Sequence, residues 1–236
     1  MSKPVLILTC EHAGQMIPES VAKCFASKAA RSALASHEGY DPGALRIFNH
    51  LRDLAAFSLA GETSRLVIEL NRSLHHRNLL CRFTRDLPKT VRQTLISEIH
   101  DPFRDQVRQA IQQSLPVIHL SVHTFTPRLH GVERNCDLAL LYDPQRPHEK
   151  TFCDKIAAAF HSSPFRFRRN HPYRGIADGH TKALRKIFPD SHYSGIELEV
   201  SQHFFDPELP ETESLLNLVR QSIIPHVRIH EQTSTT

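Results

Sequence analysis

The chain has 236 residues, a formal net charge of +4 with histidine neutral, and five cysteines. This length fits one large α/β domain that buries roughly 70–75% of its extended-chain surface, and no stretch approaches the roughly 18 apolar residues of a membrane span. The cysteines are odd in number and widely spaced, which argues against a disulfide framework and a thiolate zinc site. We therefore expect a cytoplasmic protein with no membrane partner, and the apolar stretch near the N-terminus is too short for a signal peptide.

Arginines gather in two parts of the sequence, a pattern that suits either nucleic acid or a small anionic substrate. Aromatic residues make up only 7% of the chain, tryptophan is absent, and no DNA- or RNA-binding motif occurs. We therefore expect a small anionic molecule, and no nucleic acid, as the partner. The first group contains Arg65, Arg72, Arg77, Arg82 and Arg85, and the second contains Arg166, Arg168, Arg169 and Arg174.

Short runs rich in Val, Ile and Leu alternate with segments whose apolar residues recur at helical spacing. The apolar runs predict strands at residues 4–9, 65–70, 117–122, 136–141, 165–169 and 195–200. The helical spacing predicts helices after Pro18, from residue 41 onward, and at residues 91–99, 103–115, 149–160, 181–187 and 211–224. This alternation predicts a mostly parallel sheet covered on both faces, in a single domain spanning residues 1–236 with a frayed tail at 226–236.

Histidines stand where two of the predicted strands end. His12 follows the first strand, and His123 follows the strand at 117–122. Open α/β sheets bind ligands at the carboxyl ends of their strands, so two imidazoles placed there are candidate metal ligands. Either one could instead be a hydrogen-bonded histidine without a ligand role. If one of them binds a metal, we expect the other to bind it too.

A catalytic zinc site needs a third protein ligand, and the sequence offers two carboxylates for it. Glu11 adjoins His12, and neighbours on an extended chain point to opposite faces, so both reach one metal only if the backbone turns sharply between them. Asp41 is therefore the preferred third ligand, with Glu11 kept as the alternative. The position of Asp41 before a predicted helix also suits a plain N-cap.

Glu199 stands at the end of the last predicted strand, and Glu197 lies two residues earlier on the same face. Strand interiors rarely bury a carboxylate without a partner or a function. As a general base and acid, Glu199 would take a proton from the attacking water and return it to the leaving amine. The alternative is an ion pair between Glu199 and a nearby arginine.

Arg72, preceded by Asn71, stands where the predicted strand at 65–70 ends. Arginine suits a bidentate contact with a substrate carboxylate, and Asn71 can add a hydrogen bond. The alternative for Arg72 is a structural salt bridge. Arg174 is a second candidate for binding the substrate, on a predicted loop.

Five segments resemble the motifs of the N-formylglutamate amidohydrolase family and occur in the order of that family. Each is short, but together they span nearly the whole chain, which makes the resemblance specific. They are Glu11-His12-Ala13-Gly14 with Ile17-Pro18, His37-Glu38-Gly39-Tyr40-Asp41-Pro42-Gly43-Ala44, Ser64-Arg65-Leu66-Val67-Ile68-Glu69-Leu70-Asn71-Arg72, Val122-His123-Thr124-Phe125-Thr126-Pro127, and Gly195-Ile196-Glu197-Leu198-Glu199-Val200-Ser201-Gln202.

The resemblance implies a three-layer α/β/α sandwich similar to the zinc carboxypeptidases and the aspartoacylase-type hydrolases. It implies hydrolysis of the amide bond of a small N-acyl amino acid, with N-formyl-L-glutamate as the expected substrate. The expected cofactor is zinc or another divalent transition metal, held by His12, Asp41 and His123. Glu199 is similar to the catalytic glutamate of those enzymes, and Leu70-Asn71-Arg72 to their carboxylate-binding segment.

The chain departs from the carboxypeptidase pattern at Gln15, where that pattern has a glutamate ligand. The carboxylate ligand must then come from elsewhere, which also favours Asp41. Two alternatives stay open from the sequence. One is a zinc exopeptidase or another deacylase with the same centre, and the other is a noncatalytic anion-binding protein with the same fold.

Overall fold

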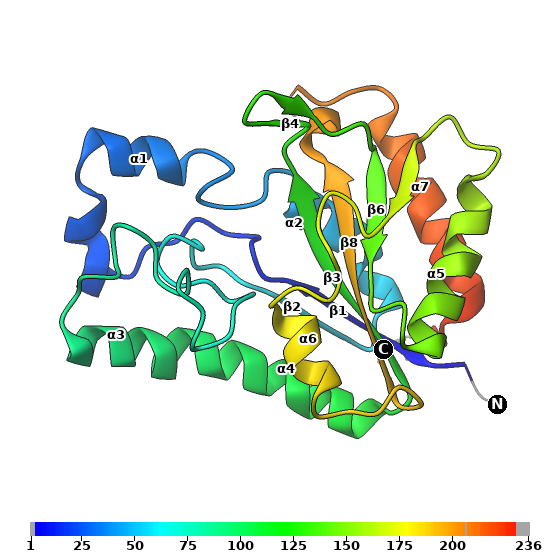
Figure 1. The fold of residues 1–236 in the computed structure, drawn as a ribbon, viewed down its shortest axis with the longest axis horizontal. Helices are drawn as coiled ribbons and strands as arrows, with labels where there is room; N and C mark the ends of the chain where they lie inside the picture. Colours follow the sequence, from blue (N-terminus) through cyan, green and yellow to red (C-terminus); the bar gives the residue numbers. More distant parts are fainter. Residues whose placement is uncertain (1–2, 206, 230–236) are drawn as a thin grey trace, which may run out of the picture.

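A six-stranded sheet forms the centre of the computed structural model, which describes residues 3–205 and 207–229 (Figure 1). Its strands are β1 Val5–Cys10, β2 Phe57–Ala60, β3 Val117–Phe125, β6 Leu138–Leu141, β7 Phe167–Arg169 and β8 Tyr193–Ser201. They stand in the order β2-β1-β3-β8-β6-β7. The first four of these run parallel, whereas β6 pairs antiparallel with β8, and β7 pairs parallel with β6. The expected mostly parallel sheet is confirmed.

Helices cover both faces of the sheet. The α-helices are α1 Lys28–Leu34, α2 Ala44–Leu51, α3 Lys89–Leu95, α4 Asp101–Ser114, α5 Pro147–Phe160, α6 His180–Arg185 and α7 Thr212–Ile223. One face of the sheet packs against α2, α5 and α7, and the other packs against α4 and α6 (Figure 1). This is the expected three-layer α/β/α sandwich.

Shorter elements connect these layers. A π-helical turn at Ile96–His100 joins α3 to α4. The strands β4 Arg128–Leu129 and β5 Val132–Glu133 form a separate antiparallel pair. Turns of 3-10 helix occupy Glu19–Phe25, Arg52–Leu54, Gln202–Phe204 and Ile224–His226.

The burial of the central strands follows from the sandwich. In β1, Leu6 and Leu8 join the core under α2, α5 and α7, whereas Ile7 joins the core under α4 and α6. Successive strand residues face opposite sides, so a strand covered on both faces is buried at every position. All nine residues of β3 are buried, including His119 and His123. Polar side chains in such a strand need partners inside the protein, and these partners build the site described below.

The predicted strand at 65–70 is wrong, because this segment forms turns and irregular chain. Leu66, Val67 and Ile68 instead enter a third hydrophobic cluster, together with residues of α1, α3 and the 3-10 turn at Glu19–Phe25, whereas Leu70 joins the core under α4 and α6. The strand beside β1 is β2, whose residues are all half-buried. A buried irregular segment is as apolar as a buried strand, and a half-buried edge strand is less apolar than either. The apolar content of residues 65–70 therefore suggested a strand there, whereas that of β2 did not.

The start of α2 also differs from the sequence prediction. Asp41 was a candidate N-cap, but Gly43 occupies that position with a φ of +87°, and no side chain caps the helix. A Cβ atom on Gly43 would lie 2.2 Å from the ring of Phe205, so this position requires glycine for space as well as for its backbone conformation. The side chain of Asp41 is therefore free of the helix and faces the strand ends.

The beginning of the predicted frayed tail is ordered. Val227 is buried in the main core, and the backbone N–H of Arg228 donates to the carbonyl of Pro4 at 2.8 Å. The rest of the predicted tail, residues 230–236, lies outside the described residues. Among the helices that are described, none is long and apolar enough to cross a membrane.

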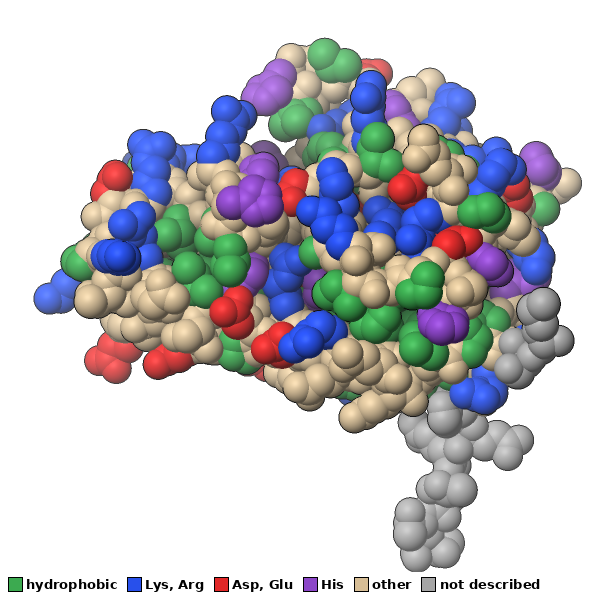
Figure 2. All heavy atoms as spheres, turned by 60° about the horizontal axis from the view of Figure 1, so that its bottom comes forward, with side chains coloured by type: hydrophobic (Ala, Val, Ile, Leu, Met, Phe, Trp, Pro, Cys, Tyr) green, Lys and Arg blue, Asp and Glu red, His purple; other side chains and the backbone are tan. Residues whose placement is uncertain are grey.

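The arginine groups seen in the sequence are interspersed with other side chains on the folded surface. On the face shown in Figure 2, Lys and Arg side chains alternate with acidic, histidine and apolar ones. Several of the arginines are paired with carboxylates: Arg82 with Glu38, Arg166 with Asp137, and Arg169 with Asp154. These pairs neutralise much of the positive charge that the sequence suggested.

Candidate metal and catalytic site

Three side chains from separate segments meet at the carboxyl edge of the sheet. His12 follows β1, His123 lies near the end of the neighbouring strand β3, and Asp41 precedes α2. The Nδ1 atoms of the two histidines are 3.1 Å apart. Oδ2 of Asp41 lies 3.2 Å from Nδ1 of His12 and 3.0 Å from Nδ1 of His123. All three side chains are buried, and they form a group that could hold a metal ion.

This triangle of donor atoms fits a tetrahedral metal. Nitrogen and oxygen ligands lie about 2.0–2.1 Å from zinc, so two ligands of a tetrahedral site are about 3.3 Å apart. The charges around the triangle also fit, because the carboxylates of Glu11, Asp41, Glu69 and Glu199 are all buried near it. Such a concentration of buried negative charge favours a divalent cation.

The electrostatics of the ligands themselves point the same way. Burial alone would raise the pKa of Asp41, but His12, His123 and Arg65 outweigh it and hold that pKa well below its ordinary value. Burial alone would lower the pKa of His123, but Asp41, Glu11 and Glu199 raise it to about 10. The position between these side chains therefore stabilises positive charge.

The ring of His12 is oriented by Glu69, which is itself held by Arg65. Its Nε2 contacts Oε1 of Glu69, and the other oxygen of Glu69 accepts from Nε and Nη2 of Arg65 at 2.9 and 2.6 Å. Arg65 also donates from Nη1 to Asp41 at 3.1 Å. The hydrogen bond to Glu69 places a proton on Nε2 of His12, which leaves the lone pair of Nδ1 for a metal.

His123 is oriented in the same way by a different set of residues. Its Nε2 lies 2.9 Å from Oγ of Ser121 and 3.5 Å from Oε2 of Glu11. Glu11 in turn accepts from Ser121 at 2.6 Å and from Thr9 at 3.0 Å, and its Oε1 lies 3.1 Å from Nδ1 of His180. Glu11 therefore lies behind His123, and the structure favours Asp41 over Glu11 as the carboxylate of the metal group.

Glu69 offers a test of this arrangement. We expect Glu69→Gln to weaken zinc binding by about 10- to 100-fold, because an amide is a poorer acceptor for the His12 ring and no longer balances Arg65. Competition with a chromogenic chelator measures this affinity. Glu38→Gln is the matched control, because Glu38 is a surface residue that pairs with Arg82 at 2.6 Å. Equal zinc affinity in a folded Glu69→Gln protein and in the control would contradict the assignment.

Glu199 lies beside the metal group on the next strand of the sheet. Its Cα is the register partner of the Cα of His123, and its side chain is 5% exposed. Its Oε2 has no hydrogen-bond partner among the described residues. Burial and the neighbouring charges of Asp41 and Glu197 raise the pKa of Glu199 to about 8, against the opposing effect of His123. A buried carboxylate with a free oxygen and a raised pKa has the properties of a general base.

Glu197 differs from Glu199 although both residues are on the same face of β8. Its Oε1 accepts a hydrogen bond from the hydroxyl of Thr181, at the start of α6, at 2.8 Å. Glu197 is thus tied to a helix, which supports the choice of Glu199 for proton transfer.

The proposed substrate-binding residues have different surroundings. The amide of Asn71 is held by the protein, because its Oδ1 accepts from the backbone of His180 at 2.7 Å and its Nδ2 lies 3.4 Å from His123. Arg72 donates from Nη1 to the carbonyls of Asp178 and Asn71. The exposed Arg174 makes no side-chain hydrogen bond or ion pair within the described residues. The structure therefore favours a positioning role for Asn71.

A comparison with known protein families connects this geometry to an activity. The sequence model of a family described as N-formylglutamate amidohydrolase matches residues 4–205. The chain belongs to the N-formylglutamate amidohydrolase family. As a member of this family, it is a hydrolase that acts on an amide bond. Among curated protein sequences, none matches the chain significantly.

Two solved structures resemble this N-formylglutamate amidohydrolase family member over nearly their whole length. The gene product Atu2144 from Agrobacterium tumefaciens has 25% sequence identity and a TM-score of 0.76, with 94% of this chain and 92% of that chain covered. N-formylglutamate amidohydrolase from Ralstonia eutropha JMP134 has 15% identity and a TM-score of 0.69, with 95% and 93% covered. The second likeness shows a shared fold.

Sequence reasoning missed three members of this site: Glu69, Arg65 and His180. The first two had a signal, since Glu69 is a lone carboxylate in an otherwise apolar run and Arg65 precedes it by four residues. A carboxylate buried in such a run needs a cationic partner. His180 had no comparable signal, because it stands in a polar turn that resembles the surroundings of the surface histidines.

Proposed function

We propose that this chain uses a divalent metal to hydrolyse the amide bond of an N-acyl amino acid, with N-formyl-L-glutamate as its substrate. The metal in this proposal is zinc or another divalent transition metal, and its ligands are His12, Asp41 and His123. The observation that carries the proposal is the triangle of donor atoms 3.0 to 3.2 Å apart with the free carboxylate oxygen of Glu199 beside it.

The residues of the chain divide the work of the reaction. A metal bound by the triangle supplies a Lewis acid that polarises the substrate carbonyl and makes water more acidic. Glu199 accepts a proton from the attacking water at its free oxygen. It then returns that proton to the amide nitrogen as the carbon–nitrogen bond breaks, so the products are a carboxylate and a free amino acid. Glu69 and Glu11 hold the two histidine rings in place throughout.

Substrate recognition in this proposal rests on cationic side chains near the site. Arg65 already bonds Asp41 and Glu69, so its charge balances these carboxylates and is not assigned to the substrate. Arg72 uses only Nη1 in hydrogen bonds within the described residues, which leaves its Nε and Nη2 for a substrate carboxylate. Arg174, on the exposed loop, is proposed to add a second charge.

Replacing Arg72 with lysine tests this recognition. We expect Arg72→Lys to raise the KM for N-formyl-L-glutamate by about tenfold, because lysine keeps the charge but loses the planar pair of donors. The KM for the α-carboxamide of the same substrate should change much less. Arg77→Lys is the control, since Arg77 is an exposed arginine on the same loop. Equal effects on the acid and the amide would assign Arg72 to structure instead.

The proposed reaction is tested by measuring amine release from a series of N-acyl amino acids, with zinc-loaded and chelated protein side by side. Metal-dependent cleavage of N-formyl-L-glutamate ahead of the other compounds supports the proposal. Preferential removal of C-terminal residues from peptides would favour the exopeptidase alternative. A zinc-loaded protein that cleaves none of these compounds would favour the noncatalytic anion-binding alternative.

A further inference from the structure

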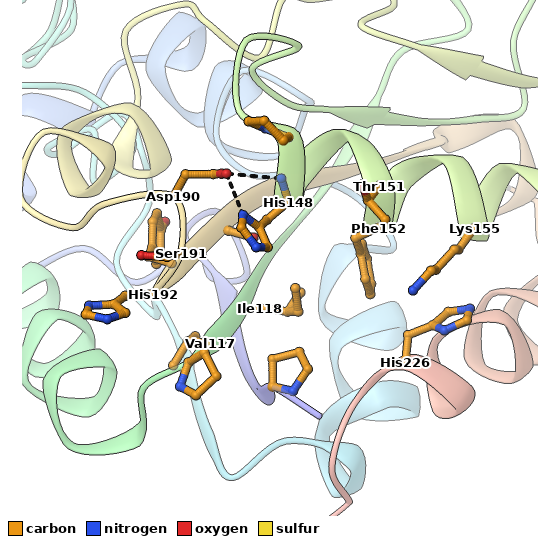
Figure 3. Close-up of a pocket in the computed structure, with 15 residues that line it drawn as sticks. Val117, Ile118, His148, Thr151, Phe152, Lys155, Asp190, Ser191, His192 and His226 are labelled. Carbon is orange, nitrogen blue, oxygen red and sulfur yellow. Dashed lines mark hydrogen bonds and ion pairs between the residues drawn. The ribbon is translucent and has the colours of Figure 1, made fainter. Parts of the chain in front are cut away.

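A cavity lies at the opposite end of the sheet from His12, Asp41 and His123. Its volume is about 470 Å³, and it lies between the first turns of α5, the amino ends of β3 and β8, and the turn at Ile224–His226 (Figure 3). Val117 opens β3 and lines the cavity, whereas His123 is six residues farther along the strand. At about 3.3 Å per residue, the two ends are about 20 Å apart. The cavity is thus separate from the candidate catalytic site.

The floor of this cavity is apolar. Ile118 and Phe152 project toward its centre in Figure 3, and three prolines complete the surface: Pro4, Pro116 and Pro147. A concave apolar surface of this size is typical of a site for a small organic molecule. It favours a ligand with an apolar body over a simple inorganic ion.

One end of the cavity carries positive charge. Figure 3 shows the amino group of Lys155 next to the ring of His226. The pKa of His226 is lowered first by burial and then by the charges of Lys155 and Lys3, so both lysines lie near this ring, which is neutral at neutral pH. Within the described residues, none of the three forms an ion pair. On the same helix, Lys150 does form one, with Asp154.

Asp190, a carboxylate that lines the cavity, contacts His148 and Arg146. Oδ2 of Asp190 accepts from the backbone N–H of His148 at 3.1 Å and lies 2.6 Å from its Nδ1. The other oxygen of Asp190 forms an ion pair with Arg146, 3.5 Å from its Nε, and makes no hydrogen bond within the described residues. Asp190 is therefore paired at the start of α5, whereas the charges of Lys3 and Lys155 have no carboxylate partner within the described residues.

We propose that this cavity binds a small organic carboxylate with an aromatic or aliphatic body. The carboxylate lies against Lys155 and His226, and the body lies on Ile118 and Phe152. An anion there supplies the charge that the cluster lacks, and an apolar body removes the floor from water. A neutral molecule would leave the charges of Lys155 and Lys3 without a partner.

A titration with 3-phenylpropionate tests this site, followed by backbone amide NMR of the ¹⁵N-labelled protein. We expect saturable shifts at His148, Thr151, Phe152 and Lys155 and at residues 191–194, which line the cavity. The neutral analogue 3-phenylpropanamide should bind at least about 5-fold more weakly, because it lacks the charge. Binding of the acid and the amide with equal affinity, or shifts confined to the carboxyl edge of the sheet, would overturn the proposal.

Three substitutions at exposed positions of α5 distinguish binding in the cavity from binding elsewhere. Lys155→Gln should weaken 3-phenylpropionate binding by about 3- to 5-fold, whereas Lys150→Gln, the same charge change outside the cavity, should leave it unchanged. Thr151→Trp places a large side chain at the cavity wall and should abolish the binding. Equal affinities in both lysine variants, or full binding in Thr151→Trp, would show that the molecule binds elsewhere.

Discussion

Replacing Glu199 with glutamine should lower kcat by about 10²- to 10⁴-fold while the protein keeps its fold and its metal. Glutamine has nearly the same shape, but its amide cannot accept the proton of the attacking water. Glu199 is not one of the three residues that could hold a metal, so metal content should not change. The experiment compares steady-state kinetics on an N-acyl amino acid with metal analysis of the same samples.

Glu197→Gln is the matched control for this substitution, because Glu197 is on the same face of the same strand and is tied to Thr181. It should reduce kcat much less. A larger loss in Glu197→Gln than in Glu199→Gln would move the proton-transfer role to Glu197. Full activity in both variants would show that neither Glu197 nor Glu199 acts as the general base.

Removing either histidine of the triangle should remove the metal, and activity with it. We expect His12→Ala and His123→Ala to contain less than about a tenth of the metal of the unmodified protein, because only two of the three protein ligands remain. Metal analysis by mass spectrometry after gel filtration gives the content directly. Treatment of the unmodified protein with a strong chelator should abolish its activity, and added zinc should restore it.

The control for these variants is His37→Ala, which removes an exposed histidine from the segment before Asp41. It should keep both the metal and the activity. A double variant His12→Ala, His123→Ala that still binds one metal per chain would show that the metal lies elsewhere. Loss of metal in the His37→Ala variant as well would point to general unfolding.

The sequence could predict that His12 and His123 lie close together, because the ends of strands can be recognised in it. The apolar runs before His12 and His123 become neighbouring parallel strands, and parallel neighbours bring their ends to one edge of the sheet. Asp41 could be chosen only indirectly, because the adjacent residues Glu11 and His12 point to opposite faces of an extended chain. The structure adds the reason for its position: Gly43 takes the N-cap position of α2, so the side chain of Asp41 faces the histidines.

The contacts of Glu69 and Glu11, which hold the two histidine rings, could not be predicted in the same way. Glu69 belongs to an apolar segment that composition could not distinguish from a strand, and its contact with His12 spans 57 positions of sequence. Glu11 was recognised as a carboxylate at the site, but its bonds to Ser121 and His180 depend on how β1, β3 and α6 pack. Local patterns report strands and helices, whereas these contacts are set by tertiary packing.

Four crowded carboxylates make the stability of the folded chain, and so its amount in a cell, sensitive to a bound cation. Glu11, Asp41, Glu69 and Glu199 are all nearly excluded from water in one small region, and Arg65 is the guanidinium that bonds two of them. A metal bound there stabilises the folded chain by mass action, and its absence leaves that repulsion unrelieved. Proteases remove unfolded chains continuously, so a small loss of stability lowers abundance several-fold. On our proposal, zinc supply therefore controls how much of the protein persists, as well as how fast each copy works.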